Sequence, residues 1–261
     1  RHIHSPVRTN FFNRFLYGRL ADAVITTGSR VGDILSEELR LERSHFVSIP
    51  TGVDLTRFTG QGAREKLRQE WNLKDDEVAI GVVAALRGMK NHRLFIAAAA
   101  RLREEIPGLR FFIVGDGPPR ANLEAYAAEL KLQKLLTFTG HRNDIPDVMA
   151  AIDIVALTSS RGEGVPQSLS QALAMQKPVV ATDVGSISEI VRHEETGLLV
   201  PPDDLDAFIA AAKRLIDNPP LAASLGAAGR RLIETSYSET KMAQDTEELI
   251  LRLLREKRLL P

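Results

Sequence analysis

The sequence predicts an α/β chain with a doubly wound, parallel β-sheet. Short apolar runs rich in β-branched residues alternate with segments of 3.6-residue periodicity, a pattern typical of βαβ units. Several of these runs are apolar throughout, as expected for strands covered by helices on both faces. The runs that we expect to form strands are 22–28, 46–50, 78–86, 110–117, 135–140, 153–160, 177–183 and 196–202.

Cap residues mark where the intervening helices begin. Pro118 and Pro119 stand where a helix would start, because proline fits the first helical turn, in which an N–H has no partner to lose. Ser186 with Glu189 three residues later predicts a capping box. Asp203 and Asp204 precede the amphipathic segment 205–217 and mark where it begins. The α-helical parts of the pattern therefore have recognisable ends as well as a period.

The chain divides near residues 49–58, which read IPTGVDLTRF. About fifty residues precede this point, too few to bury a core alone, so we expect 1–54 to be the tail of a first domain whose beginning is absent. Residues 55–237 hold a complete, Rossmann-like set of strands and helices. The final segment, 238–261, has the pattern of one long amphipathic helix.

The composition excludes several classes of protein. The 261 residues carry 34 basic and 34 acidic side chains, so no overall field favours nucleic acid as a partner. The absence of cysteine excludes disulfides and Cys-ligated zinc and suits a reducing cytoplasm. The apolar runs are far shorter than the roughly 20 residues that span a bilayer. We expect a cytoplasmic protein, at most peripheral at the inner face of the membrane.

Two cations follow the expected strand at 78–86. In open parallel sheets, ligands lie beyond the carboxyl ends of the strands, where loops lead into helix N-termini. Arg87 and Lys90 stand at such a place, and arginine can bind a diphosphate in a bidentate way. A pair of solvated surface charges explains the same two residues equally well.

The next loop, VGDGPPR, meets only part of a dinucleotide fingerprint. Gly115 and Gly117 fit the first two positions of G-x-G-x-x-G, but Arg120 occupies the third. The next strand also lacks the acidic residue that would hold a ribose. We favour a tight turn into a helix, with the turn at the border of a cleft. In the following loop His141, Arg142 and Asp144 are explained first by local capping or pairing.

An acidic residue stands in a glycine- and proline-rich turn after the strand at 153–160. Gly162 and Gly164 flank Glu163 and leave room for a ligand to approach the backbone. The N–H groups after Pro166 are expected to point at an anion from a helix start. Gln171, about two turns along the helix, can offer a donor and an acceptor to a diol such as a ribose.

Taken together, these motifs resemble a known family. The stretch SSRGEGVPQSLSQALAMQKPVVATDVGSISEIV occurs with IPTGVDLTRF, the Arg87 and Lys90 pair, VGDGP, FTGHRNDI and TGLLVPPDD, in this order. The set resembles the nucleotide-sugar half of the retaining GT-B glycosyltransferases called group 1, or family 4, over about residues 25–235. The order of several motifs makes the resemblance specific where each motif alone is weak.

The resemblance implies a GT-B fold and a transferase. It implies that 1–54 is a remnant of the N-terminal acceptor domain, that 55–237 binds the donor, and that 238–261 crosses back toward the first domain. The donor would be a UDP- or GDP-sugar, and the acceptor a glycan or lipid-linked glycan in lipopolysaccharide or surface polysaccharide synthesis, with retention at the anomeric carbon. No cofactor and no metal are expected.

The resemblance also implies roles for individual residues. Arg87 and Lys90 would neutralise the leaving diphosphate, and Glu163 would contact the sugar. Gln171 stands where the family has a glutamate that binds the ribose, and the loss of charge would weaken that contact by about 1 kcal/mol. The further donor contacts that we expect are Gly115, Asp116, His141, Arg142, Gly164, Val165, Pro166, Gln167 and Ser168.

Other interpretations stay open. The basic and aromatic start of the chain, 1–28, could face an anionic glycolipid or the membrane, although we favour a helix that packs its apolar stripe on a sheet. A nucleotide-sugar 2-epimerase would need carboxylates and a histidine in the cleft, which we cannot place. A non-catalytic sugar-nucleotide-binding subunit is supported by Gln171 and by the incomplete first domain. Alone, the chain is expected to bind donor and transfer nothing.

Overall fold

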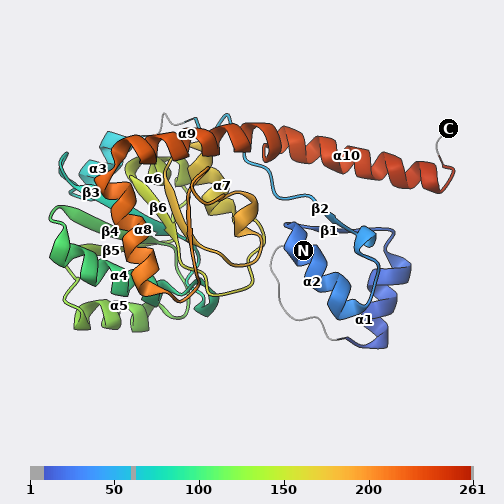
Figure 1. Ribbon diagram of the computed structural model, residues 1–261, viewed down its shortest axis with the longest axis horizontal. Helices are drawn as coiled ribbons and strands as arrows, with labels where there is room; N and C mark the ends of the chain where they lie inside the picture. Colours follow the sequence, from blue (N-terminus) through green and yellow to red (C-terminus); the bar gives the residue numbers. More distant parts are fainter. Residues whose placement is uncertain (1–8, 60–62, 260–261) are drawn as a thin grey trace.

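The computed structural model describes residues 9–59 and 63–259, which form two units of unequal size (Figure 1). The larger unit contains a six-stranded sheet covered by helices, and the smaller unit contains a two-stranded sheet. Neighbouring strands pair in parallel in both sheets. The predicted α/β class with a parallel sheet is therefore confirmed.

Each of the eight apolar runs corresponds to one strand. The strands are shorter than the runs, and β4 begins one residue before its run, at Leu109. The order in the large sheet is β5-β4-β3-β6-β7-β8. The chain moves outward in one direction from β3 and in the other from β6, so these two adjacent strands mark a topological switch point. The strands are β1 (Val24–Thr26), β2 (Phe46–Ser48), β3 (Val78–Val83), β4 (Leu109–Val114), β5 (Leu136–Gly140), β6 (Ile154–Leu157), β7 (Val179–Thr182) and β8 (Leu198–Val200).

Helices cover both faces of the large sheet. Phe111 and Phe112 are neighbours in β4, and they pack into opposite hydrophobic layers, which explains why the strand is apolar throughout. The ring of Phe112 stacks on Trp71 at 4.3 Å between centroids. One layer includes residues of α3 (Arg64–Glu70), α6 (Ile145–Ala151) and α7 (Gln167–Ala174), and the other those of α4 (His92–Glu105), α5 (Arg120–Glu129) and α8 (Leu205–Asp217). Helix α9 (Pro219–Ser236) contributes to both.

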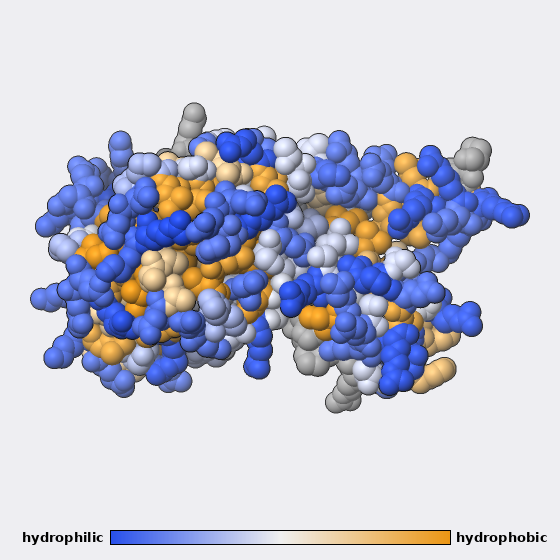
Figure 2. Space-filling model, in the orientation of Figure 1, coloured by the Kyte–Doolittle hydropathy of each residue, from blue (hydrophilic) through white to orange (hydrophobic). Residues whose placement is uncertain are grey.

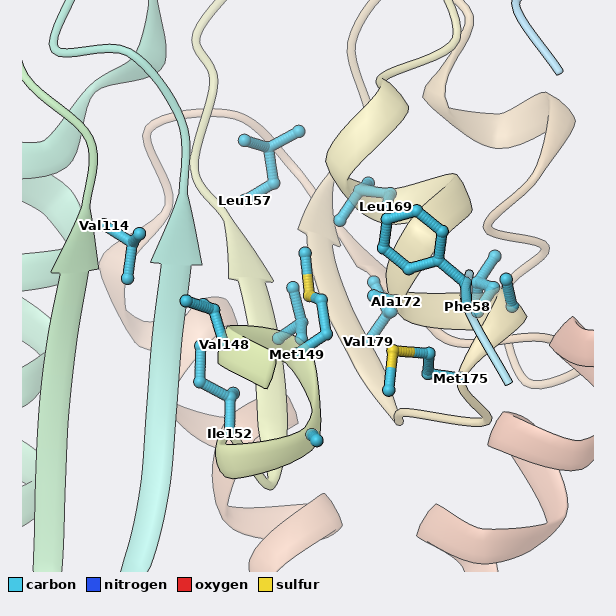
Figure 3. Close-up of a cluster of buried hydrophobic side chains, with 14 of the residues drawn as sticks. Phe58, Val114, Val148, Met149, Ile152, Leu157, Leu169, Ala172, Met175 and Val179 are labelled. Carbon is cyan, nitrogen blue, oxygen red and sulfur yellow. The ribbon is translucent and has the colours of Figure 1, made fainter. Parts of the chain in front are cut away.

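The layer beneath α7 fixes the position of the turn that precedes this helix. Figure 3 shows Met149 of α6 on the side toward Leu169 and Ala172 of α7, with Val148 and Ile152 on the side toward Val114 of β4. All five side chains other than Val114 are 0% exposed, so the helix cannot shift without opening a cavity in the core. The residues at the N-terminus of α7 are thereby held in a defined place.

The smaller unit has a core of its own. Helix α2 (Ser29–Leu39) buries Val31, Leu35 and Leu39 against Phe46 of β2. Helix α1 (Phe11–Phe15) and the π-helical turn η1 (Leu16–Leu20) precede β1, and the 3₁₀ turn η2 (Arg43–His45) precedes β2.

Our expectation for the first helix was wrong. Helix α1 buries none of its residues, with Phe11 85% and Phe12 68% exposed, so the apolar side chains do not pack on a sheet of the described chain. The basic residues Arg1 and Arg8 of the predicted surface lie outside the described residues. Figure 2 shows hydrophobic colour at the surface of this unit among mostly hydrophilic side chains.

The two units are joined by two crossings of the chain that lie side by side. The N–H of Val53 donates to the carbonyl of Tyr237 (2.9 Å), and the N–H of Glu239 donates to the carbonyl of Val53 (3.1 Å). Helix α10 (Glu239–Glu256) then runs past β2, buries Leu249, and is followed by Lys257, which pairs with Asp22 at 2.7 Å (Figure 1). The proposed division into 1–54, 55–237 and 238–261 stays a prediction.

Cap geometry agrees with the sequence at two helices and differs at one motif. Pro119 precedes α5, and Asp204 caps α8 by accepting from the N–H of Ala207 (2.9 Å). The predicted capping box at Ser186 is wrong, because Ser186 makes no side-chain capping bond to the 3₁₀ turn η4 (Ile187–Glu189). Within the described residues, no helix has the length and apolar character that crossing a membrane requires.

Candidate functional site

The loops that follow β3 and β6 meet at the switch point and bring opposite charges together. Lys90 ends the 3₁₀ turn η3 (Gly88–Lys90), and its Nζ donates to Oε1 of Glu163 at 2.6 Å. Lys90 is 16% exposed and Glu163 only 3%, so the pair is largely withdrawn from water. A lysine has three N–H donors, and this contact leaves two of them for a ligand.

Hydroxyl groups fix both members of this pair. Ser159 Oγ donates to the same oxygen of Glu163, and the Ser159 carbonyl accepts from Thr182 of β7. Thr158 Oγ1 donates to the carbonyl of Lys90 at 3.1 Å. Sequence reasoning missed these residues; the run of hydroxyl side chains directly after an apolar strand is the signal that could have found them.

Helix α7 presents free N–H groups beside the pair. Pro166 precedes it and makes no side-chain capping bond. Among the described residues, the N–H groups of Gln167 and Ser168 have no hydrogen-bond acceptor, whereas the next two N–H groups donate to the Pro166 carbonyl. A helix N-terminus with free N–H groups favours an anion.

These groups line one cavity of about 280 Å³. That volume is near the lower end of the roughly 300–1,000 Å³ typical of small-molecule sites. The side chain of Gln167 also anchors the wall, since its Nε2 donates to the carbonyl of Gly52 at 3.1 Å. The lining comprises Thr27, Thr51, Val83, Ala84, Ala85, Lys90, Glu163, Gly164, Val165, Pro166, Gln167 and Ser168.

Two glycines allow the turn around Glu163 to form. Gly162 has φ +74° and Gly185 has φ +58°, values that other residues adopt with strain. A Cβ at Gly185 would lie 2.0 Å from the Glu163 carbonyl oxygen, which accepts a hydrogen bond from the Ser186 N–H at 3.1 Å. The backbone of Glu163 is therefore packed directly against the loop after β7.

Two predicted residues from the same elements lie outside the lining of this cavity. Arg87 is exposed at the start of η3. Gln171 is half-buried on α7, three residues after Ser168 and so on the same face of the helix. Their predicted roles stay predictions.

The other predicted contacts belong to neighbouring loops with local partners. Gly115 packs against the carbonyl of Ala84, a cavity residue, and Asp116 accepts from the N–H of Gly117 at 2.7 Å. The His141 ring contacts the side-chain oxygen of Asn143 at 3.1 Å. None of the three predicted residues lines the cavity of about 280 Å³.

Arg142 is held by acidic neighbours. It pairs with Asp144 and with Glu70, both at 2.6 Å, and hydrogen bonds to these two carboxylates raise its pKa. The guanidinium also lies 6.0 Å from the centre of the Trp71 ring. The local pairing that the sequence favoured is thus what the structure shows for this residue.

His92 is a buried histidine that the sequence did not single out. It starts α4, is 2% exposed, and its Nε2 has no partner among the described residues. Burial, followed by the nearby charge of Lys90, lowers its pKa to about 4. His92 is therefore neutral near pH 7, which leaves Lys90 as the cation at this point. Within the described residues, no cluster of three or more His, Asp and Glu side chains is suited to a metal ion.

Solved structures share this architecture. A glycosyltransferase from Rickettsia africae superposes with a TM-score of 0.88 at 21% identity, over 97% of this chain and 69% of that one. The Anabaena protein HepE in complex with UDP-glucose gives 0.85 at 23% identity, over 96% and 71%. The C-terminal domain of a Francisella tularensis glycosyl transferase group 1 protein gives 0.64 at 28% identity, over 72% and 99%. The fold is that of the GT-B glycosyltransferases.

The sequence comparisons give the family. The group described as Glycosyl transferases group 1 matches residues 63–232, and the chain belongs to that family. It is 32% identical over 190 residues to an Escherichia coli UDP-Gal:alpha-D-GlcNAc-diphosphoundecaprenol alpha-1,3-galactosyltransferase, covering 71% of this chain and 49% of the relative. It is 31% identical over 232 residues to the Rhizobium meliloti lipopolysaccharide core biosynthesis mannosyltransferase LpsB, covering 86% and 64%. The chain spans about half the length of the first curated relatives that it matches.

Proposed function

We propose that the chain supplies the donor site of a glycosyltransferase that moves a sugar from a nucleotide-diphosphate sugar to a glycan or lipid-linked acceptor, with retention. The observation that carries this proposal is the Lys90–Glu163 pair in a cavity that also contains the free N–H groups of α7. Cation and helix N-terminus suit a diphosphate, and the carboxylate suits the sugar attached to it.

The proposed reaction uses the charged groups of this cavity. The bond from the anomeric carbon to the diphosphate oxygen breaks through an oxocarbenium-like state, and the electron pair leaves on the diphosphate. The two remaining N–H donors of Lys90 and the N–H groups of Gln167 and Ser168 stabilise that charge. Glu163, held by Lys90 and Ser159, presents negative charge to the positive sugar. The acceptor oxygen bonds to the anomeric carbon, and its proton passes to the departing diphosphate.

The printed names of relatives support the substrate class. The Escherichia coli relative uses UDP-Gal and a diphosphoundecaprenol-linked acceptor, and the Rhizobium meliloti relative acts in lipopolysaccharide core biosynthesis. The HepE structure holds UDP-glucose. We therefore propose a UDP- or GDP-sugar as the donor and a role in surface polysaccharide or lipopolysaccharide synthesis. A cytoplasmic location, at most peripheral at the inner face of the membrane, remains an expectation.

A non-catalytic, sugar-nucleotide-binding subunit is the second candidate. The observation that favours it is Gln171, which carries no charge and does not line the cavity. Both candidates bind nucleotide sugar in the same place, so binding alone tests the site, and transfer by the full-length enzyme separates the two functions.

A thermal-shift panel with UDP, GDP, ADP and CMP sugars tests the site. Ligand at 100 times its dissociation constant stabilises a protein by about 2.7 kcal/mol, so a bound donor should raise the Tm visibly. We expect the double variant Lys90→Met/Glu163→Gln to lose this shift. Removing both charges avoids leaving one of them buried without its partner.

The matched control is the exposed pair formed by Lys213 and Glu105, which joins α8 to α4. The variant Lys213→Met/Glu105→Gln removes the same two kinds of charge and should keep the full ligand shift. Equal protection of all three proteins by the donor would remove the Lys90 and Glu163 cavity from consideration as the diphosphate site.

A further inference from the structure

A second cavity, of about 400 Å³, also has Glu163 in its lining. Its walls come from both units of the molecule. Helix α2 contributes Arg30, Val31 and Ile34, the turn after β6 contributes residues 160–163, and the loop after β7 contributes residues 183–185. Glu163 thus belongs to two cavities, and the proposed donor site occupies only the first.

Hydrogen bonds between the two units fix the walls of this second cavity. The N–H of Val165 donates to the carbonyl of Thr27 at 2.7 Å. The carboxylate of Glu189 accepts from the N–H of Ser29 at 2.8 Å and from its hydroxyl at 2.7 Å. These contacts set where α2 begins, and Arg30 is its second residue, so the position of Arg30 relative to the turn at Glu163 is determined.

Apart from Glu163, the lining of the cavity carries an excess of positive charge. Arg30 and Arg161 are exposed, and among residues 9–59 and 63–259 neither side chain forms an ion pair or hydrogen bond. Glu163 is already paired with Lys90. Asp183 is the remaining acidic residue of the lining. Two guanidinium groups, one from α2 and one from the turn after β6, suit a phosphate, which arginine binds through two parallel N–H donors.

We propose that this cavity binds the acceptor and that the acceptor is anionic: a phosphate ester whose phosphate is held by Arg30 and Arg161 and whose hydroxyl groups donate to Asp183. The proposal rests on the proposed function, since it takes the first cavity as the donor site. With both sites filled, the acceptor and the donor sugar meet at Glu163, the residue that the two linings share.

The same phosphate chemistry can be presented by a soluble sugar phosphate or by a lipid headgroup. Two arms separate these sources. Glycerol 3-phosphate is titrated into the chain by calorimetry at saturating UDP, and co-sedimentation is measured with phosphatidylcholine vesicles with and without phosphatidylglycerol. Binding of free glycerol 3-phosphate supports a soluble acceptor, and binding confined to the anionic vesicles supports a lipid-linked one.

The variant Arg30→Gln/Arg161→Gln is expected to lower the affinity for whichever probe the parent binds by at least about tenfold. The rise in Tm that UDP causes should stay unchanged, because neither residue lines the donor cavity. Arg30→Lys/Arg161→Lys keeps the charge but loses the bidentate fork, and should fall between this variant and the parent. The control, Arg231→Gln/Lys134→Gln, removes two exposed cations elsewhere on the surface and should bind as the parent does.

The proposal is overturned if the parent binds neither probe, if the Arg30/Arg161 variant binds as tightly as the parent, or if the control pair loses as much affinity. The UDP shift makes this failure distinct from failure of the donor site. If UDP raises the Tm of the parent but the Arg30/Arg161 variant binds the probe as the parent does, the proposed function stands and only the acceptor cavity is rejected.

Discussion

Glu189 accepts two hydrogen bonds from Ser29, a residue 160 positions earlier and in the other unit of the molecule. One bond comes from the backbone N–H and one from the hydroxyl. Because Ser29 is the first residue of α2, the carboxylate caps this helix and interacts favourably with its dipole. A cap of this kind fastens the two units together at the edge of the second cavity.

Replacing Glu189 by alanine should lower the free energy of unfolding by about 2 kcal/mol, the cost of a lost charged cap. Urea denaturation followed by circular dichroism measures this loss. Glu195→Ala, which removes an exposed carboxylate 4.0 Å from Arg192, should cost less than about 0.5 kcal/mol. Equal losses in the two variants would mean that the cap contributes nothing.

Gly185→Ala should abolish the donor-induced thermal shift and lower the Tm. The new Cβ would stand 2.0 Å from the Glu163 carbonyl oxygen at a residue with φ +58°, so the turn that carries Glu163 must move. Gly88→Ala is the control, because a Cβ there meets no atom within 4 Å. A Gly185→Ala protein that responds to donor as the parent does would show that the turn tolerates the displacement.

Glu163→Gln in the full-length enzyme should lower the rate of transfer by about 100-fold or more while donor binding persists. The amide oxygen still accepts from Ser159, but the negative charge that stabilises the positive sugar is gone. Transfer is measured with radiolabelled donor, beside a Glu124→Gln control in which an exposed carboxylate on α5 is replaced. Undiminished turnover would contradict the role given to Glu163.

His92 should make the free energy of unfolding depend on pH. Its pKa in the folded protein is about 4 and its ordinary value is 6.5, so the unfolded chain binds more protons between these values and stability falls as pH drops through this range. From pH 7.5 to pH 5 this one group should cost about 2 kcal/mol. Over the same pH interval, the His92→Gln variant should lose correspondingly less free energy of unfolding in urea denaturation. Parallel pH profiles of the parent and the variant would rule out a buried neutral His92.

Much of the fold was predictable because its determinants are local. The eight strands coincide with apolar runs, and Phe111 and Phe112 show why such runs lack alternation, since each faces a different hydrophobic layer. The meeting of Lys90 and Glu163 also follows from sequence, because the loops after strands at a switch point converge. Both inferences rest on the order of strands and loops along the chain, without knowledge of individual side-chain contacts.

What could not be predicted depends on partners far away in the sequence. Ser186 and Glu189 have the spacing of a capping box, but Glu189 finds a helix N-terminus at Ser29, a partner that local spacing cannot reveal. His92 reads as an ordinary first helical residue, and only the packed structure shows its burial. The exposed Phe11 illustrates the converse, since an apolar pattern does not say whether a covering surface is present.

The paired backbone bonds of Val53 with Tyr237 and Glu239 also have a mechanical consequence. Because the two connecting segments are hydrogen-bonded to each other, they cannot slide independently, and they join the units at a single point near Val53. A rotation of one unit about this point would have to break the hydrogen bonds of Val165 with Thr27 and of Glu189 with Ser29, which join the units elsewhere. Because displacement grows with distance from the pivot, a small rotation at Val53 would separate the far surfaces of the two units most widely.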